Sequence, residues 1–500
     1  MRNPVLLAVL LAAAACGSAA ERILAVFPSS SPSQVNVYTA LTKELARRGH
    51  QVTVLSPFPQ KAAPPGYIDF DLMHGPVAEF KNSLANEGPV LYSPEPRHFF
   101  HTALHLWRVS VGLTHAVMTS PQVKDVMKNK GGYDLVIAEH FLHEALHGLA
   151  WYFEVPLVLF APSDLVPLPS GVAPLSYVPH PLLALNKPMS FTDRLVNVLA
   201  NAFWTLGYNY YYLPQQDAIS NEVFGNEVPS IWEIKPWLVL LNSDPALNGP
   251  VPRMPWEVEV GGLHVRSTPW PLPDELQAFL DGADAGLVYF SFGSSLRCSQ
   301  MPPALRQVFV DAFRALPQRV VWVYDEDELQ YKPENVFIAK WVHQQEVLAH
   351  PNTVAMITHG GPVSGQEAAF FGVPVVAIPV FGDQRIRAQR TQRDNLGVML
   401  EMRNVTTPSL LWALQEVTTN PRIKEASVQR RVAGAEAGAA LEKAVFWVEW
   451  VLRRRGDARG DAWSAPRLRF WQRHSLDVVG AALLGPAAAI FLLVVVVLRK

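Results

Sequence analysis

The sequence predicts an α/β protein built from two doubly wound parallel sheets. Short apolar runs alternate with helical stretches in both halves of the chain, which is typical of βαβ units. The 500 residues, 49% of them hydrophobic, are enough for two separate cores. Between the halves, residues 242–273 are rich in proline and contain Gly261-Gly262, a composition that favours a connection between domains.

The first half opens with a βαβ pattern. A helix expected over 35–48 follows the loop 28–33 and is ended by Gly49. Two later stretches, 97–111 and 195–212, are rich in aromatic and apolar residues; most of these should pack in the core, and some should line a pocket for a lipophilic molecule. The strands expected in this half are Ile23–Phe27, Val52–Leu55, Leu135–Ala138, Pro156–Phe160 and Leu238–Leu241.

The second half repeats the alternation and ends in helices. These helices are expected after Pro408, after Pro421 and over 433–452. Ligands of such sheets bind at the carboxyl ends of the strands, so we expect the site at those ends of both sheets. The strands expected in this half are Leu287–Phe290, Val320–Val323, Val336–Ala339, Val354–Thr358 and Val375–Ile378.

The turn after Val354–Thr358 has the composition of an anion site. His359, Gly360 and Gly361 lead from a buried strand into a helix, and Pro362 suits the first helical position because its φ is fixed and it has no N–H. The free amides of the first helical turn attract negative charge, and phosphate is the usual ligand of such an end.

Three side-chain types around this turn indicate a larger ligand than phosphate. Glu367 in the helix can accept hydrogen bonds from a ribose diol, and Trp341 offers a ring for stacking a base. Asp383 and Gln384, after the next strand, supply the acceptors and donors that bind a hexose. Each of these residue types alone is common in a core or on a surface. Together, and in this order, they indicate a nucleotide-sugar site.

These motifs resemble the donor signature of the UDP-glycosyltransferases, the family of animal glucuronosyl- and glucosyltransferases. His343 replaces a proline of the family pattern, and Arg387 stands where an asparagine is common. The resemblance extends over nearly the whole chain and is to the membrane-anchored, insect-like members of the family. The matching residues are Phe290 to Ser294, Trp341, Gln344, His350-Pro351, Thr358 to Gly361, Glu367, Gly372 to Pro374, Pro379, Phe381, Asp383 and Gln384.

The resemblance implies a GT-B arrangement, in which two Rossmann-like domains face one cleft. It implies that UDP-sugar is a co-substrate and that no further cofactor is required. It also assigns donor contacts: Trp341 and Gln344 to uridine and Glu367 to ribose, with the hexose on Asp383 and Gln384. The phosphates would lie on Ser294, His359 and Ser364 beside the Gly360-Gly361 turn.

The catalytic base that the resemblance implies is missing. The family uses a histidine in the first βα loop, oriented by a carboxylate, and the equivalent position here is Gln34, which cannot accept a proton. The carboxylate falls at Glu139, with Glu144 as a second candidate. Either another group serves as the base, or the protein is a catalytically weakened UDP-sugar-binding homologue. The histidines considered for that role are His98, His101 and His140.

A rival motif lies beside Glu139. His143, Glu144 and His147 fit the H-E-x-x-H pattern, which on one helix places two imidazoles for zinc with a glutamate as base. No third ligand is identifiable downstream, and the same stretch fits a βα unit. A zinc metalloprotease is therefore only a remote alternative, and the main hypothesis includes no metal.

The two ends of the chain indicate export and membrane anchoring. Residues 1–20 read as a secretory signal peptide, and 478–498 as a transmembrane helix. The expected domains are 21–260 for the acceptor and 261–455 for UDP-sugar, with a linker at 456–477 and a cytosolic tail at 499–500. This topology is single-pass type I in the endoplasmic reticulum membrane, with lumenal domains and a usable glycosylation sequon at Asn404.

Charge and cysteine content exclude several other classes. With 42 basic and 44 acidic residues, the chain has no excess charge to attract nucleic acid. Cleavage of the signal would leave Cys298 as the one cysteine, which rules out an internal disulfide. The predicted function is transfer of a hexose, with glucose favoured, to small lipophilic hydroxyl compounds with inversion; a homo-oligomer is possible.

Overall fold

The structure is a computed structural model of the whole chain. It divides into two compact units, Met1–Asp457 and Ala458–Lys500. In the second unit, only residue 472 and the helical residues 477–481 are described. The residues that the structure describes are 20–29, 31–84, 92, 98–163, 174–185, 188–249, 251–266, 268–294, 296–434, 437–456, 472 and 477–481.

The predicted signal peptide and membrane helix lie almost entirely outside these residues. Residues 1–19 and 482–500 are not described, so the structure tests neither segment. Among the helices that are described, none combines the length and the apolar composition that crossing a membrane requires.

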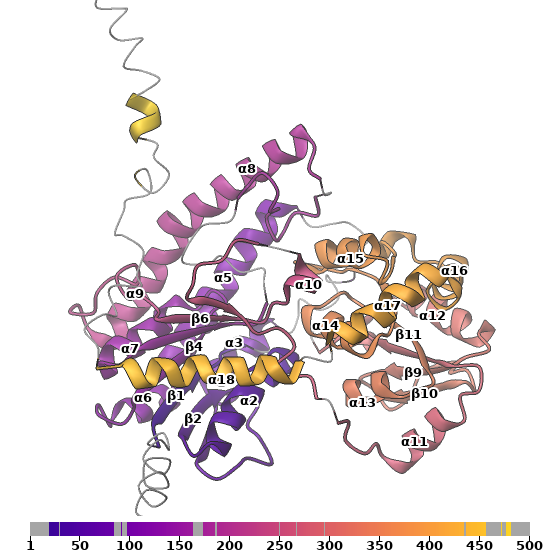
Figure 1. The fold of residues 1–500 in the computed structure, drawn as a ribbon, viewed down its shortest axis with the longest axis horizontal. Coiled ribbons are helices and arrows are strands. Elements are labelled where there is room, and N and C mark those ends of the chain that lie inside the picture. The colour runs from indigo at the N-terminus through magenta and orange to yellow at the C-terminus, as the bar shows by residue number, and fades with distance from the viewer. Residues whose placement is uncertain are drawn as a thin grey trace, which may run out of the picture. The chain divides into compact units, whose positions relative to one another are not determined.

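The first unit contains two parallel sheets, as predicted (Figure 1). The first sheet has the strand order β3-β2-β1-β4-β5-β6-β7, and its central strands are buried on both faces by apolar side chains. Its strands are β1 (Arg22–Val26), β2 (Gln51–Ser56), β3 (Tyr67–Asp71), β4 (Leu135–Glu139), β5 (Leu157–Ala161), β6 (Leu238–Leu241) and β7 (Glu257–Glu259).

The second sheet has the order β10-β9-β8-β11-β12-β13. Its central strand β8 pairs with both β9 and β11, which brings the ends of β8 and β11 together at the site described below. Its strands are β8 (Leu287–Ser291), β9 (Arg319–Val323), β10 (Val336–Ala339), β11 (Thr353–Thr358), β12 (Val375–Ala377) and β13 (Gly397–Met399).

Every predicted strand is present, but three strands were not predicted. The strand β7 lies inside the stretch that we expected to be an interdomain connection, and β13 is a three-residue strand that begins at a glycine. The strand β3 carries two aspartates, a residue type that is depleted in strands. All three are edge strands or short strands whose sequences lack the apolar run on which the predictions depended.

One helix of the first half was predicted, and the other helices described in this half were not. The helix α2 begins three residues earlier than expected, at Pro32, because proline at the first position presets the helical φ. The helices are α2 (Pro32–Arg47), α3 (Pro76–Leu84), α5 (Phe99–Met118), α6 (Pro121–Met127), α7 (His147–Phe153), α8 (Phe191–Gly207), α9 (Leu213–Phe224) and α10 (Pro245–Asn248), with a 3₁₀ turn η2 (Glu144–Leu146) and a π-helical turn η3 (Tyr208–Tyr212).

Helices of the second half surround the sheet that carries the donor motif. The helix α14 starts at Pro362, as predicted, with Gly361 as its N-cap. The helices are α11 (Asp274–Asp281), α12 (Pro303–Ala315), α13 (Gln344–Ala349), α14 (Pro362–Phe371), α15 (Gln384–Arg393), α16 (Thr407–Thr419), α17 (Pro421–Gly434) and α18 (Ala437–Arg454), with 3₁₀ turns η4 (Cys298–Gln300) and η5 (Met402–Asn404).

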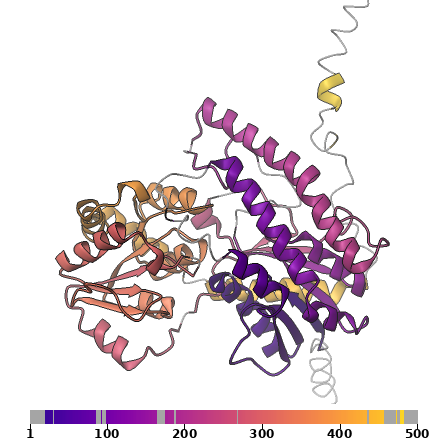
Figure 2. The ribbon, with the colours of Figure 1, turned by 180° about the vertical axis from the view of Figure 1, so that it is seen from behind.

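The last long helix, α18, packs with the first sheet although it follows the second in sequence. Figures 1 and 2 show α18 lying beside the strands of the first sheet and α2. Ala444, Val445 and Val448 are buried in one core cluster with residues of β1, α2 and β6. Arg455, just after this helix, pairs with Glu21 at 2.6 Å and with Asp134 at 2.9 Å. The sequence predicts that residues up to 455 belong with the second sheet, but the buried residues of α18 pack in the core of the first sheet.

Candidate active site

The helix start after β11 is built around the imidazole of His359. A Cβ added to Gly293 would lie 2.5 Å from His359 Cε1, and one added to Gly361 would lie 2.5 Å from Nε2, so only glycine fits at both positions. Burial lowers the pKa of His359 to about 4, although Asp383 opposes the shift. The ring is therefore neutral at physiological pH and can act as a hydrogen-bond donor toward an anion at the helix start.

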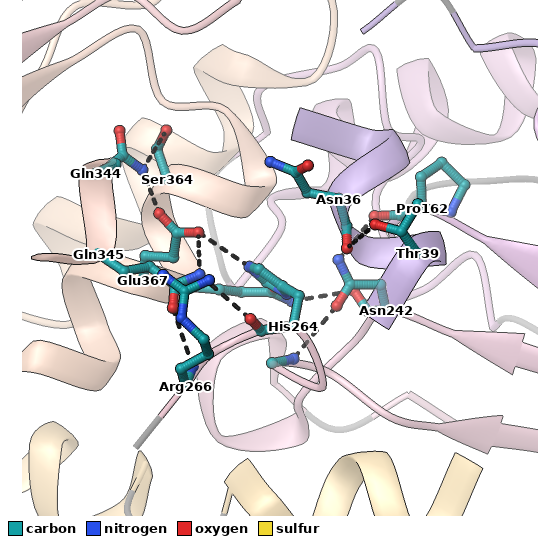
Figure 3. Close-up of polar contacts among 12 residues, drawn as sticks. Asn36, Thr39, Pro162, Asn242, His264, Arg266, Gln344, Gln345, Ser364 and Glu367 are labelled. Carbon is teal, nitrogen blue, oxygen red and sulfur yellow. Dashed lines mark hydrogen bonds and ion pairs between the residues drawn. The ribbon is translucent and has the colours of Figure 1, made fainter. Parts of the chain in front are cut away.

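Glu367 is a buried carboxylate held by two glutamines (Figure 3). Its Oε1 accepts a hydrogen bond from Gln345 Nε2 at 3.0 Å, and its Oε2 accepts one from Gln344 Nε2. The Nε2 of His264 lies 3.3 Å from Oε1. Because an ionised carboxylate offers about four acceptor positions, these bonds leave capacity for two hydroxyl groups of a ligand.

Three residues around Glu367 were not predicted. His264 and Arg266 come from the connection before α11, and Gln345 follows the predicted Gln344. Gln345 Oε1 accepts from the backbone N–H of Arg266 at 3.0 Å, and the Arg266 guanidinium pairs with the buried Glu346. The only signal for them in the sequence is a basic residue and a histidine in an otherwise proline-rich stretch.

Asp383 and Gln384 lie together at the start of α15, but each already has an internal partner. Asp383 Oδ2 pairs with Arg387 Nε at 2.8 Å, and Gln384 Oε1 accepts from the backbone N–H groups of Val380 and Phe381 at 2.8 and 3.0 Å. Arg387, the departure from the family pattern, thus competes for one of the two residues expected to bind the hexose.

One large cavity joins these residues to the first sheet. We call it the central cavity; its volume is about 590 Å³, within the range of small-molecule sites. Trp341, at 55% exposure, presents its ring there. Of the predicted donor residues, the central cavity is lined by all except Gly360, which lines a smaller cavity beside it: Ser294, Trp341, Gln344, His359, Gly361, Ser364, Glu367, Asp383 and Gln384.

The opposite wall of the central cavity comes from the first sheet and its helices. Ser31 Oγ lies 3.1 Å from Ser294 Oγ, so the two halves of the unit touch at the cavity. Four apolar side chains make part of this wall lipophilic: Leu106, Val109, Leu113 and Phe141. The first two lie in the stretch 97–111, for which a lipophilic lining was expected, and the other two lie outside it. No residue of the second expected stretch, 195–212, lines the cavity.

Gln34 and Glu139 both line the central cavity, linked through Ser29. Gln34 Oε1 accepts from Ser29 Oγ, and Glu139 Oε2 accepts from the Ser29 backbone N–H at 2.8 Å. Glu139 Oε1 accepts from Tyr38 Oη at 3.1 Å. Burial raises the pKa of Glu139 to about 7, against these hydrogen bonds, which lower it. Gln34 is in the first turn of α2, not in a loop as we expected.

Glu144, the second candidate carboxylate, does not line the central cavity. Its two oxygens accept hydrogen bonds from Tyr208 at 2.6 Å and Tyr212 at 2.9 Å, which makes it a structural carboxylate between helices. The histidines considered as replacement bases, His98, His101 and His140, do not line it either. Sequence reasoning did not propose His143 as a base, yet His143 does line it.

The H-E-x-x-H segment does not form a zinc site in the described structure. The pattern needs one helix, but His143 precedes the 3₁₀ turn η2 and His147 begins α7. His143 is hydrogen-bonded to Thr114 and Glu144 to two tyrosines. In the described ranges, no three His, Cys, Asp or Glu residues are grouped in a way that could hold a metal. The remote metalloprotease alternative is therefore dropped.

A family model described as UDP-glucuronosyl and UDP-glucosyl transferase matches residues 22–500. The chain belongs to this family. Two relatives show how broad the match is. The UDP-glycosyltransferase UGT5 of Dactylopius coccus is 31% identical over 95% of this chain and 90% of its own length. The UDP-glucuronosyltransferase 2B19 of Macaca fascicularis is 29% identical over 94% of this chain and 91% of its own length.

Solved structures match the fold. The crystal structure of TcCGT1 in complex with UDP superposes with a TM-score of 0.59 and 16% identity, covering 87% of this chain and 100% of the other. That of CalG4, the calicheamicin glycosyltransferase, has a TM-score of 0.56 and 20% identity, covering 87% and 99%. At these identities the likeness establishes the fold alone, and that fold is GT-B, as predicted.

Proposed function

We propose that this protein transfers a hexose, with glucose favoured, from a UDP-sugar to small lipophilic hydroxyl compounds, with inversion. The observation that carries the proposal is the central cavity, in which donor-motif residues face an apolar wall and a carboxyl group of raised pKa. A donor, an acceptor and a proton acceptor can therefore meet in one place.

The donor is expected to follow the motif. The uracil would stack on the exposed ring of Trp341, and the ribose diol would donate to Glu367. The diphosphate would accept hydrogen bonds from Ser294, Ser364 and His359 near the amides at the start of α14. The hexose would lie against Asp383 and Gln384, where Arg387 must yield or share Asp383. No metal or other cofactor is part of the proposal.

The reaction needs one proton acceptor near the acceptor hydroxyl. The hydroxyl oxygen attacks the anomeric carbon opposite UDP, the carbon–oxygen bond to the diphosphate breaks, and UDP leaves with the bonding electrons. The hydroxyl proton must pass to the protein, and Gln34 cannot take it. Glu139 can, because it lines the cavity and its pKa of about 7 is close to the working pH.

Gln34 also supports a second candidate function. A member of the family without a histidine at this position could bind UDP-sugars while transferring them slowly. Both candidates require the same donor site, so they differ in turnover and agree in UDP binding.

The first prediction concerns the donor site. Replacing Glu367 with alanine should weaken UDP binding by about 1–3 kcal/mol, because the ribose diol would lose its acceptor in a buried place. Isothermal titration calorimetry with UDP measures this directly. Glu367→Gln keeps the volume and one acceptor oxygen, so its loss should be smaller.

The control is Glu334→Ala, which removes an exposed carboxylate that does not line the central cavity. Its affinity for UDP should equal that of the parent. If Glu367→Ala also binds UDP as tightly as the parent, the ribose is not at Glu367 and the donor placement is wrong.

We further propose the topology that the sequence predicts: a single-pass type I protein anchored in the endoplasmic reticulum membrane, with its globular domains in the lumen. Asn404 is exposed, and Thr406 of its sequon caps α16. We expect one endoglycosidase-sensitive glycan, seen as a shift in electrophoretic mobility, that Asn404→Gln abolishes. Protease added to sealed microsomes should spare the globular part; cleavage within that part would reverse the proposed orientation.

A further inference from the structure

His143 is held at the acceptor end of the central cavity by an unusual turn. The chain leaves β4 at Glu139, and Leu142 adopts φ +63°, a left-handed conformation that a leucine seldom takes. His143 follows as the N-cap of η2 and lines the central cavity with Ser110, Leu113 and Phe141. The turn thus directs a buried imidazole to the wall where an acceptor would lie.

Thr114 fixes the tautomer of this ring. The single hydroxyl proton of Thr114 is donated to the backbone carbonyl of Ser110 at 2.7 Å. Thr114 Oγ1 must then accept the 2.8 Å hydrogen bond that joins it to His143 Nδ1, and the ring must donate it. We therefore assign the ring proton to Nδ1. The other nitrogen, Nε2, is left with a lone pair and has no hydrogen-bond partner among the described residues.

Further polar groups hold Thr114 and the ring in place. Gln216 is fully buried and donates from Nε2 to Tyr212 Oη at 2.9 Å and more weakly to Thr114 Oγ1 at 3.5 Å. Gln216 Oε1 accepts from the backbone N–H of Ala145 at 3.0 Å, and Tyr212 donates to Glu144. The H-E-x-x-H motif therefore belongs to a polar network under the acceptor wall.

We propose that His143 Nε2 binds the acceptor by accepting the hydrogen bond of its hydroxyl group before transfer begins. Because the hydroxyl has a single proton, this proton must turn from Nε2 to Glu139 when the reaction starts. This inference deepens the proposed function, on which it rests for the identity of the ligand as an acceptor. Burial lowers the pKa of His143 to about 3, so the ring stays neutral and keeps this lone pair at every physiological pH.

The chemistry of this contact selects one class of acceptor. A phenol or alcohol can donate its O–H to Nε2 while its apolar body rests on Leu113 and Phe141. An ether has no proton to donate to Nε2. The negative charge of a carboxylate would be repelled by the lone pair of Nε2 and by the carboxylate of Glu139. We therefore expect uncharged hydroxyl compounds to bind better than ethers or carboxylates of the same shape.

The test compares ligands that differ only in this group. With UDP saturating, equilibrium dialysis should show that the parent binds 1-naphthol about 2- to 12-fold more tightly than 1-methoxynaphthalene, the range for the net contribution of one hydrogen bond. It should bind 1-naphthoate more weakly than 1-naphthol. In His143→Phe the preference for 1-naphthol over the ether should disappear, and in His143→Gln part of it should return because the amide oxygen can accept.

The matched control is His147→Leu, because His147 is equally buried, does not line the central cavity and has no partner for either ring nitrogen among the described residues. It should keep the preference of the parent. Calorimetry with UDP verifies that each variant is folded. A parent without the preference, or a His143→Phe variant that retains it, would overturn the inference.

Binding and turnover separate this inference from the proposed function. If 1-naphthol is preferred through His143 but no glycoside forms, the acceptor contact stands and the transfer reaction fails. If glycoside forms and the preference does not depend on His143, the transferase stands and the acceptor contact is wrong.

Discussion

Replacing Gln34 with histidine should raise the turnover of glycoside transfer by about 10²-fold, the lower end of the contribution of a general base. Glu139 is almost fully buried, and a hydrogen bond already occupies each of its oxygens, so it reaches the acceptor poorly. An imidazole in the first turn of α2 would extend into the central cavity, with Glu139 behind it to stabilise its charge. Steady-state kinetics with a phenol and UDP-glucose measure the gain.

The gain should appear in kcat and leave UDP affinity unchanged, because residue 34 is not among the groups placed at the nucleotide. Gln34→Leu, which removes the contact with Ser29 and adds no base, is the control and should give no increase. The gain should also be lost in the double variant Gln34→His, Glu139→Gln. A fast parent enzyme whose kcat does not change in Gln34→His would show that residue 34 is only part of the scaffold.

Replacing Glu139 with glutamine should lower kcat by about 10²-fold in the parent, the lower end of the contribution of a general base, because the group assigned to take up the proton is lost while the side-chain volume is kept. The parent should show an acid limb in its pH–rate profile. The base must be ionised, and with a pKa of about 7 its ionised fraction, and therefore the rate, falls about tenfold per pH unit below that value. The profile of Glu139→Gln should lack this limb.

Glu144→Gln is the matched control for that profile. Glu144 is also a buried carboxyl group whose pKa is raised by burial, but it is bonded to Tyr208 and Tyr212 outside the central cavity. Its acid limb should coincide with that of the parent. An unchanged rate and limb in Glu139→Gln would assign the proton to another group.

The donor half of the site was predictable because its residues lie close together in sequence. Trp341 and Gln344 follow β10, Glu367 follows β11 and Asp383 follows β12. The carboxyl ends of all strands of a parallel sheet lie at the same edge, so these residues line one cavity. Apolar runs located the strands, and proline and glycine located the helix start at Pro362. Such local signals do not depend on the rest of the fold.

The acceptor half could not be assembled in the same way, because its contacts join distant segments. The bond between Thr114 and His143 spans 29 residues, and that between Ala145 and Gln216 spans 71. The H-E-x-x-H spacing binds a metal only if both histidines lie on one helix. In the structure, Leu142 has a left-handed conformation and residues 144–146 form a 3₁₀ turn, so the expected single helix is absent, and the sequence does not show this. Arg387 departs from the family pattern in the sequence, but only the structure shows that it forms an ion pair with Asp383.

The most direct test of the account is product formation by the unaltered protein. Detergent-solubilised protein is incubated with UDP-glucose and 1-naphthol at pH 8, where Glu139 is ionised, and products are analysed by mass spectrometry and NMR. UDP and 1-naphthyl glucoside should form in equal amounts, and the glucoside should be the β-anomer because the donor is α-linked and transfer inverts the anomeric carbon. Saturable UDP binding with no glycoside from any UDP-hexose or phenol supplied would contradict the transferase and leave a binding protein.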